Sequence, residues 1–177
     1  MRGTYDGMKE LFGKGHPNTL TTLHNMAHLF ESRGDIERAL ELYKSIISVE
    51  ESNSQKYHPN TLSTLQCTAE IYVKMKDYDA AAPIFENVLR GREATFGQNH
   101  HETLLTAWHI GLLSKMKGET TKAVTYLKRA RDGFGEGHAN WRVLCAELYS
   151  CELLMLKARK KIPKLTKMSS YEMIPMK

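Results

Sequence analysis

The sequence predicts an all-α protein built from repeated helix pairs, and three observations support this prediction. The pentapeptide HPNTL occurs at residues 16–20 and again at residues 58–62, a spacing of 42 residues. The same step leads to His100, which is followed by Thr103 and Leu104. Apolar residues recur every three or four positions, and no segment of useful length alternates with the period of a strand. A helical repeat of a few tens of residues indicates a solenoid, because one helix pair cannot bury its apolar surface alone.

The first helix of each unit shows one apolar stripe at helical spacing. Its residues are Leu20, Leu23, Ala27 and Phe30 in the first unit and Leu62, Leu65, Ala69 and Tyr72 in the second. Pro17 and Pro59 disfavour a helix that runs through from the preceding residues. Asn18 and Asn60 stand where a side-chain oxygen can cap a helix. HPNTL is therefore interpreted as the end of one segment and the start of a helix.

A second amphipathic helix follows a short turn in every unit. The turn position is occupied by Gly34, Lys76 and Gly118, and a glycine there suits the left-handed conformation that ends a helix. The second stripe begins at Ala39, Ala81 and Ala123, where a small residue leaves room for a close helix crossing. Pro83 lies early in one of these helices and is expected to cost some backbone hydrogen bonding.

The repeat pattern also predicts the boundaries of the units. The motif FGxxH at residues 12–16, 96–100 and 134–138 marks the junctions. Residues 1–15 are predicted to be the end of a second helix whose own partner is missing. Repeats are predicted at 16–57, 58–99 and 100–137, with the second helix of the last one shorter by about a turn. A capping helix is predicted at 138–160, and a basic flexible tail at 161–177.

Composition places the chain among ordinary soluble proteins. It is 41% hydrophobic and 25% charged, and it has no apolar run long enough for a membrane helix or a signal peptide. Its three cysteines form neither an even disulfide set nor a CxxC pair, which fits a reducing compartment. The net charge is +5, but much of the excess lies from Lys157 onward. We therefore expect a cytoplasmic protein with no membrane partner, for which nucleic acid is an unlikely ligand.

The pattern resembles tetratricopeptide repeats of the kinesin light chain subtype. Their Leu-Asn-Asn-Leu-Ala motif corresponds to Leu23-His24-Asn25-Met26-Ala27. The aromatic, glycine, alanine and aromatic residues that follow correspond to Phe30, Gly34, Ala39 and Tyr43. The resemblance implies a right-handed α-solenoid that acts as a non-enzymatic adaptor or scaffold and holds a partner peptide or domain in its concave groove. No heptad segment that could pair with a kinesin heavy chain is present.

The resemblance also implies which residues line the groove. In the family the second asparagine of the motif reaches the peptide backbone, and Asn25 fits that role, whereas Cys67 and His109 hold the equivalent positions. Residues at helical spacing around these three complete the surface, with polar contacts early and an apolar patch around Trp108. The predicted groove consists of Thr21, His24, Asn25, His28, Ser32, Ser63, Gln66, Cys67, Glu70, Lys74, Leu105, Trp108, His109, Leu112 and Met116.

Other functions are less favoured by the sequence. His24 and His28 have the spacing of a metal-binding pair, but no third ligand is evident, so neither a metal nor a cofactor is expected. Cys67 and His109 lack an orienting acid or an oxyanion donor, so an enzyme is not expected. The alternative is a structural section of a larger scaffold without its own ligand, which could self-associate through its unpaired N-terminal edge. The basic run at 157–161 suits a nuclear-import signal, a contact for acidic partners or nucleic acid, or a solvated end.

Overall fold

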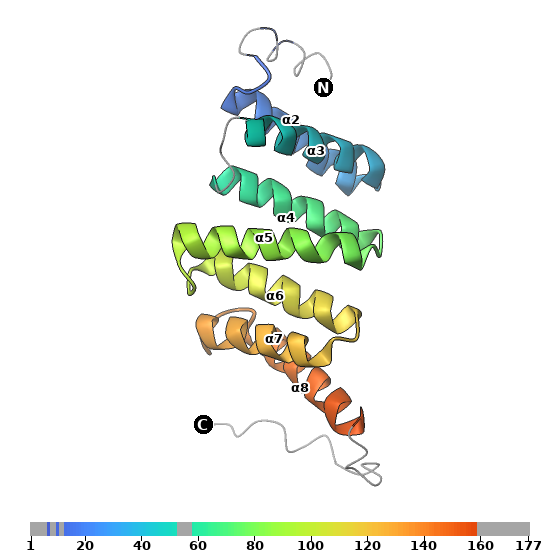
Figure 1. The fold of residues 1–177 in the computed structure, drawn as a ribbon, viewed down its shortest axis with the longest axis vertical. Coiled ribbons are helices and arrows are strands. Elements are labelled where there is room, and N and C mark those ends of the chain that lie inside the picture. Colours follow the sequence, from blue (N-terminus) through green and yellow to red (C-terminus); the bar gives the residue numbers. More distant parts are fainter. Residues whose placement is uncertain (1–6, 8–9, 11–12, 53–57, 159–177) are drawn as a thin grey trace.

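The described part of the chain is a stack of α-helices. The computed structural model describes residues 7, 10, 13–52 and 58–158. Among these residues it contains no strand. Its helices of more than one turn are α2 (Pro17–Ser32), α3 (Ile36–Ser52), α4 (Pro59–Lys74), α5 (Tyr78–Phe96), α6 (His101–Met116), α7 (Thr120–Phe134) and α8 (Trp141–Ala158). They follow one another along the long axis, with α2 and α8 at opposite ends (Figure 1). The predicted all-α solenoid is confirmed.

Helix lengths follow the repeat pattern. The pairs α2/α3, α4/α5 and α6/α7 lie within the three segments expected to form repeats. Helix α5 has 19 residues and α7 has 15, which is the loss of one turn expected for the last unit. Pro83 lies inside α5 on its exposed side, and the helix continues to Phe96. The predicted N-terminal remnant lies mostly outside the described residues, and the basic tail lies entirely outside them.

Histidine caps the first helix of each unit. The ring Nδ1 of His16 accepts a hydrogen bond of 3.2 Å from the backbone N–H of Asn18, and the corresponding distance from His58 to Asn60 is 3.3 Å. His100 repeats this contact at 3.3 Å, and His138 does so before α8 at 3.2 Å. The prediction that Asn18 and Asn60 are the caps is wrong. The imidazole of the preceding histidine satisfies the free N–H group, and each asparagine is already inside its helix.

The turns between the paired helices share one hydrogen-bond pattern. Asp35 N–H donates to the carbonyl of Phe30 at 2.9 Å and Gly34 N–H donates to Glu31 at 3.0 Å, which together form a Schellman motif. The second and third units repeat both bonds. Gly34 and Gly118 adopt φ of +81° and +78°, as this motif requires, and Lys76 adopts +61°. Lys76 is therefore a non-glycine residue in the left-handed region.

We expect Lys76→Gly to stabilise the protein by about 1 kcal/mol, because glycine removes the steric cost that a side chain carries in this conformation. Urea unfolding followed by circular dichroism measures the change. Gly34→Ala is the matched control, since an added Cβ there meets no atom within 4 Å and the backbone alone decides the result. That variant should lose about 1 kcal/mol. Equal stabilities for Lys76→Gly and the natural protein would contradict this explanation.

The core is segmented into three apolar clusters, the first mainly between α2 and α3, the second among α4, α5 and α6, and the third between α7 and α8. Tyr43, Phe85 and Leu127 occupy equivalent positions on α3, α5 and α7, and each is at most 1% exposed. Leu127 approaches the first helix of its unit, α6, at Gly111. At Gly111 an added Cβ would lie 2.8 Å from Cγ of Leu127, so the crossing of α6 and α7 is too close for a larger residue at this position.

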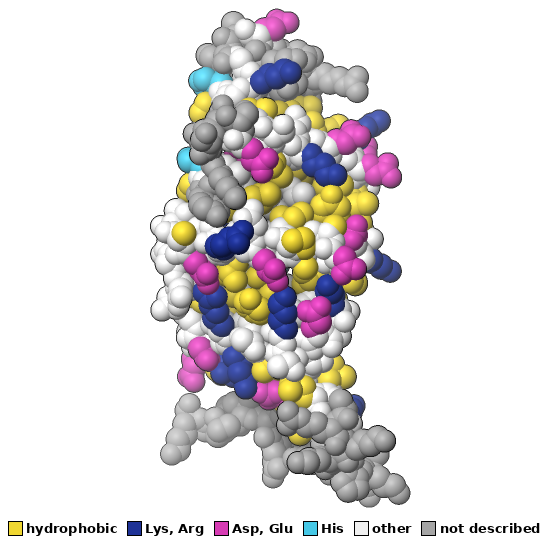
Figure 2. All heavy atoms as spheres, viewed as in Figure 1, with side chains coloured by type: hydrophobic (Ala, Val, Ile, Leu, Met, Phe, Trp, Pro, Cys, Tyr) yellow, Lys and Arg dark blue, Asp and Glu magenta, His cyan; other side chains and the backbone are white. Residues whose placement is uncertain are grey.

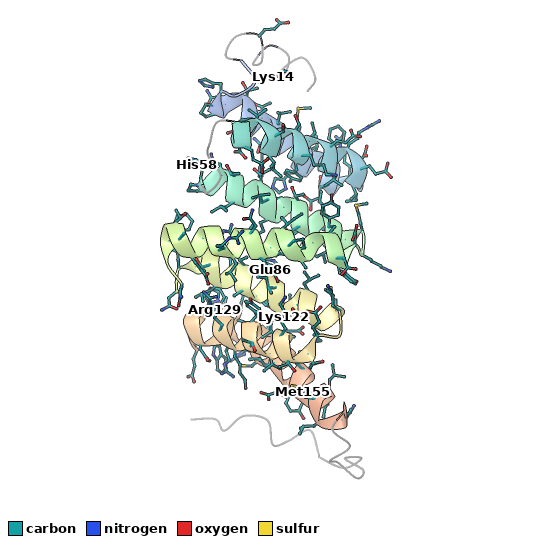
Figure 3. All side chains as sticks on the ribbon, viewed as in Figure 1. Lys14, His58, Glu86, Lys122, Arg129 and Met155 are labelled. Atoms are coloured by element: carbon teal, nitrogen blue, oxygen red, sulfur yellow. The ribbon has the colours of Figure 1, made fainter. Side chains whose placement is uncertain are left out.

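Ion pairs join the second helices of the last two units. Lys122 Nζ lies 2.7 Å from Glu86 Oε1, and the two residues face each other between α5 and α7 (Figure 3). Arg129 and Glu93 make a similar pair at 2.6 Å. Charged side chains of both signs are therefore interspersed on the face that carries α5 and α7 (Figure 2). This face is a solvated outer surface rather than a region of one charge.

Candidate functional site

The first helices of consecutive units are linked side by side. Lys74 on α4 pairs with Glu31 on α2. Glu70 Oε1 on α4 lies 3.6 Å from His109 Nε2 on α6, and Lys115 on α6 lies 2.6 Å from Glu147 on α8. Helices α2, α4, α6 and α8 therefore form one layer, and the second helices α3, α5 and α7 form the other.

None of the predicted groove residues is buried. Those on the outer part of the layer are exposed, namely Thr21, Asn25, His28, Ser32, Ser63, Lys74 and Met116. The others are half-buried, namely His24, Gln66, Cys67, Glu70, Leu105, Trp108, His109 and Leu112. Polar side chains from three units are thus at least partly accessible on the first helices.

A pocket opens between the N-terminal halves of α2 and α4. It has a volume of about 400 Å³ and is lined by Gly15, Pro17, Leu20, Thr21, His24, Asn25, Ile46, Glu50, His58, Asn60, Ser63 and Thr64. Four of the predicted groove residues, including Asn25, are among them. The structure therefore gathers the polar end of the predicted groove around one cavity.

One residue that lines the pocket differs in kind from its counterpart in the next repeat. Glu50 on α3 and Arg92 on α5 occupy equivalent positions, and each is 3% exposed. The Arg92 guanidinium bonds to the Gln66 side chain on α4 and lies 2.7 Å from Thr106 Oγ1 and 2.8 Å from Glu102 Oε2 on α6. It spans the space between α4 and α6. Glu50 has a shorter side chain than arginine, and it lines the open pocket between α2 and α4.

Glu50 is electrostatically unsatisfied within the described structure. Its Oε2 is buried without a hydrogen-bond partner, and no ion pair to a described cation compensates the carboxylate. Burial raises the pKa of Glu50 above its usual range, and nearby Thr61 opposes this effect only in part. Sequence analysis missed this residue because it belongs to a second helix. The available signal was a glutamate at the position where the next repeat has an arginine.

The apolar end of the predicted groove is only partly free. Trp108 and Leu112 pack against the cluster of α7 and α8 that contains Leu127, Leu144 and Leu148. The indole Nε1 of Trp108 is buried and has no hydrogen-bond partner within the described residues. Much of the indole therefore packs against α8 and is not available to a ligand.

Cys67 acquires two histidine neighbours through the fold. Its Sγ lies 4.0 Å from Nε2 of His28, and its donor atom and those of His24 and His28 all lie within 4.8 Å of one another. The expectation that the histidine pair lacks a third ligand is therefore wrong. Burial and the Glu70 carboxylate raise the pKa of the Cys67 thiol to about 11. A thiol that stays protonated near neutral pH is a weak nucleophile.

Consecutive helix pairs that repeat along the chain and stack on their neighbours define the class of helical-repeat proteins. The chain belongs to the tetratricopeptide repeat family, whose model matches residues 2–52 and 56–136. Proteins of this family are typically scaffolds for protein interactions and are generally non-enzymatic.

Solved structures of kinesin light chain-like repeats share the fold. Nearly identical repeats from Podosopora anserina, described as kinesin light chain repeats, align with a TM-score of 0.75 and 17% identity, over 90% of this chain and 79% of that one. BtubC from P. vanneervenii aligns with a TM-score of 0.66 and 14% identity, over 92% and 72% of the respective chains. No curated protein matches the sequence. Among the described helices, none has the length and apolar character needed to cross a bilayer.

Proposed function

We propose that this chain binds a linear peptide along α2, α4 and α6 and holds a basic side chain of that peptide in the pocket above Glu50. The pocket with its unpartnered, buried carboxylate is the observation that carries the proposal. A lysine or arginine entering it would supply the missing hydrogen-bond donors and the compensating charge. The chain would act without catalysis, and its free cysteines favour a cytoplasmic setting.

The contacts of Arg92 provide an example, within this chain, of a basic side chain bound between two adjacent first helices. In the second unit this chain's own arginine fills the space between adjacent first helices and bonds to both of them. A peptide arginine or lysine approaching from the open side would meet the equivalent space in the first unit. Asn25 lies at the rim of that pocket and is exposed, so its amide is free to bond with the peptide backbone.

The test begins with size-exclusion chromatography and light scattering on the full chain, followed by a peptide array read out on the recovered monomer. Selected peptides should share a basic residue, and its replacement by alanine should weaken binding by at least about 10-fold. Glu50→Gln and Asn25→Ala should each cost about 10-fold, measured by fluorescence polarisation. Glu37→Gln, an exposed acid on the same helix α3 as Glu50, is the matched control and should change nothing.

Two outcomes would contradict the proposal. One is a well-folded monomer that selects no peptide, which would favour the alternative of a structural section of a larger scaffold. The other is peptide binding that survives both substitutions, which would place the ligand elsewhere. Assembly into larger species without peptide selection would instead indicate self-association through an edge of the solenoid.

A further inference from the structure

Three metal-ligating side chains converge at the junction of α2 and α4. His24 and His28 are one helical turn apart on α2, and their ring centroids are 4.8 Å apart. Cys67 reaches the same point from α4 and places Sγ 4.0 Å from Nε2 of His28. In a tetrahedral zinc site the ligand atoms lie about 3.5 Å from one another. Small rotamer adjustments of two half-exposed rings are therefore enough to bring these three donors to bonding distance.

The surroundings of this cluster orient the ligands. Nδ1 of His28 lies 3.4 Å from Oε2 of Glu31. The tautomer protonated at Nδ1 would donate to this carboxylate and leave the Nε2 lone pair facing Cys67. The hydroxyl of Tyr43 donates to the same carboxylate oxygen at 3.4 Å. The Tyr43 ring lies 5.3 Å from the His24 ring and 5.9 Å from the His28 ring, measured between centroids. A buried aromatic wall and a second-sphere carboxylate thus support both imidazoles.

One ring nitrogen of His24 is unpaired among the described residues. Its Nδ1 is buried and has no hydrogen-bond partner among the described residues.

We infer that His24, His28 and Cys67 form a site for one transition-metal ion of the zinc class, with Glu31 as the carboxylate that positions His28. Two imidazoles and a thiolate suit zinc rather than magnesium or calcium, which prefer oxygen ligands. Binding exchanges the thiol proton for the metal: the S–H bond breaks, a Zn–S bond forms, and one proton leaves to solvent without any change of oxidation state. The fourth position of the tetrahedron stays open to water or to a donor group of a bound partner. This inference does not depend on peptide binding.

Cobalt(II) is a suitable spectroscopic probe of this site. Titration of the reduced full chain should give one equivalent of bound cobalt, with tetrahedral d–d bands and a thiolate-to-cobalt charge-transfer band. One equivalent of zinc should then remove both signals. Cys67→Ser should abolish the charge-transfer band and weaken binding by at least about 100-fold, and His28→Gln, at an exposed position, should do the same to the affinity. Glu31→Gln should weaken binding by about 10-fold while the charge-transfer band remains.

Matched controls separate this site from other thiols and from the peptide pocket. Cys145→Ser removes a half-buried thiol on α8 and should leave the cobalt spectrum unchanged. Glu50→Gln should bind cobalt normally even where it loses peptide. The inference is overturned by the absence of a charge-transfer band in the natural chain. It is equally overturned by a band that persists in Cys67→Ser and disappears in Cys145→Ser. Circular dichroism of each variant verifies that the fold is retained.

Discussion

Phe85→Ala is expected to lower the free energy of unfolding by about 4 kcal/mol. The Phe85 side chain is 1% exposed and lies in the apolar cluster of the second unit together with Leu89, Ile110 and Leu113. Its removal leaves a cavity between α4, α5 and α6, where the middle repeat holds its two neighbours together. Because each repeat contacts only its neighbours, a defect in the middle unit weakens the coupling of the whole stack.

The repeat itself supplies the control. Leu127 occupies the equivalent position in the third unit, so this fold already accommodates a leucine at such a position. Phe85→Leu should therefore lower the free energy of unfolding by less than about 1.5 kcal/mol. Urea unfolding monitored by circular dichroism measures both changes. The ring of Phe85 also stacks on His109 at 5.7 Å between centroids, so Phe85→Ala should free His109 on the surface of α6. Similar losses for Phe85→Ala and Phe85→Leu would show that packing volume is not the cause.

Arg92→Ala is expected to lower the free energy of unfolding by about 3 kcal/mol. The substitution removes the hydrogen bonds to Gln66 and Thr106, the ion pair with Glu102 and the buried part of the side chain together. The expected loss lies at the lower end for a broken buried ion pair, because the Glu102 side chain is 42% exposed and water can solvate it. Thermal and urea unfolding of the variant provide the measurement.

Glu50→Gln is the control for the same position in the first unit, and its effect should have the opposite sign. An unpartnered buried carboxylate costs stability, so the variant should gain about 1 kcal/mol near neutral pH. Because the pKa of Glu50 is raised in the folded state, that state holds the proton more tightly than the unfolded chain. The stability of the natural protein therefore falls as pH rises through the window between the usual glutamate range and the raised value. Below this window the two proteins should be equally stable.

The difference in stability between the natural protein and Glu50→Gln separates the effect of Glu50 from the effect of another titrating group at the pocket. His24 lines the pocket in both proteins, so its own titration largely cancels in the difference. A destabilising effect of Glu50→Gln at all pH values would mean that the carboxylate is paired and that the pocket does not lack a cation. Stabilisation together with loss of peptide binding would instead show that this position serves binding at the cost of stability.

The fold was predictable because its information is local and repeated. Apolar spacing in each helix, the glycines at 34 and 118 and the small residues at the helix crossings all act over a few residues, and the 42-residue period shows that the same solution recurs. The caps were misassigned because the nitrogen of a histidine and the oxygen of an asparagine stand two residues apart and both can accept from a free N–H group. Only the backbone geometry shows that each asparagine already lies in the first turn.

The candidate sites depended on contacts between units. Sequence spacing placed Thr21, Asn25 and Ser63 on the same surface, and the structure shows them around one pocket. Residue spacing did not indicate that Glu50 also lines that pocket. The effect of an acid at this position depends on the space that the adjacent helices leave unfilled. His24 and His28 were visible as a pair along one helix. Cys67 joins them from a position 39 residues later along the chain than His28.

The sequence alone therefore determined the helices, their pairing and the surface formed by the first helix of each unit, because these follow from periodicities within one helix or one repeat. The tertiary structure decided which side chains of neighbouring repeats meet, where space remains between them and which charge is left without a partner. Those properties depend on distances between helices and on the size of each side chain at the crossing, and residue spacing along the chain does not encode them locally.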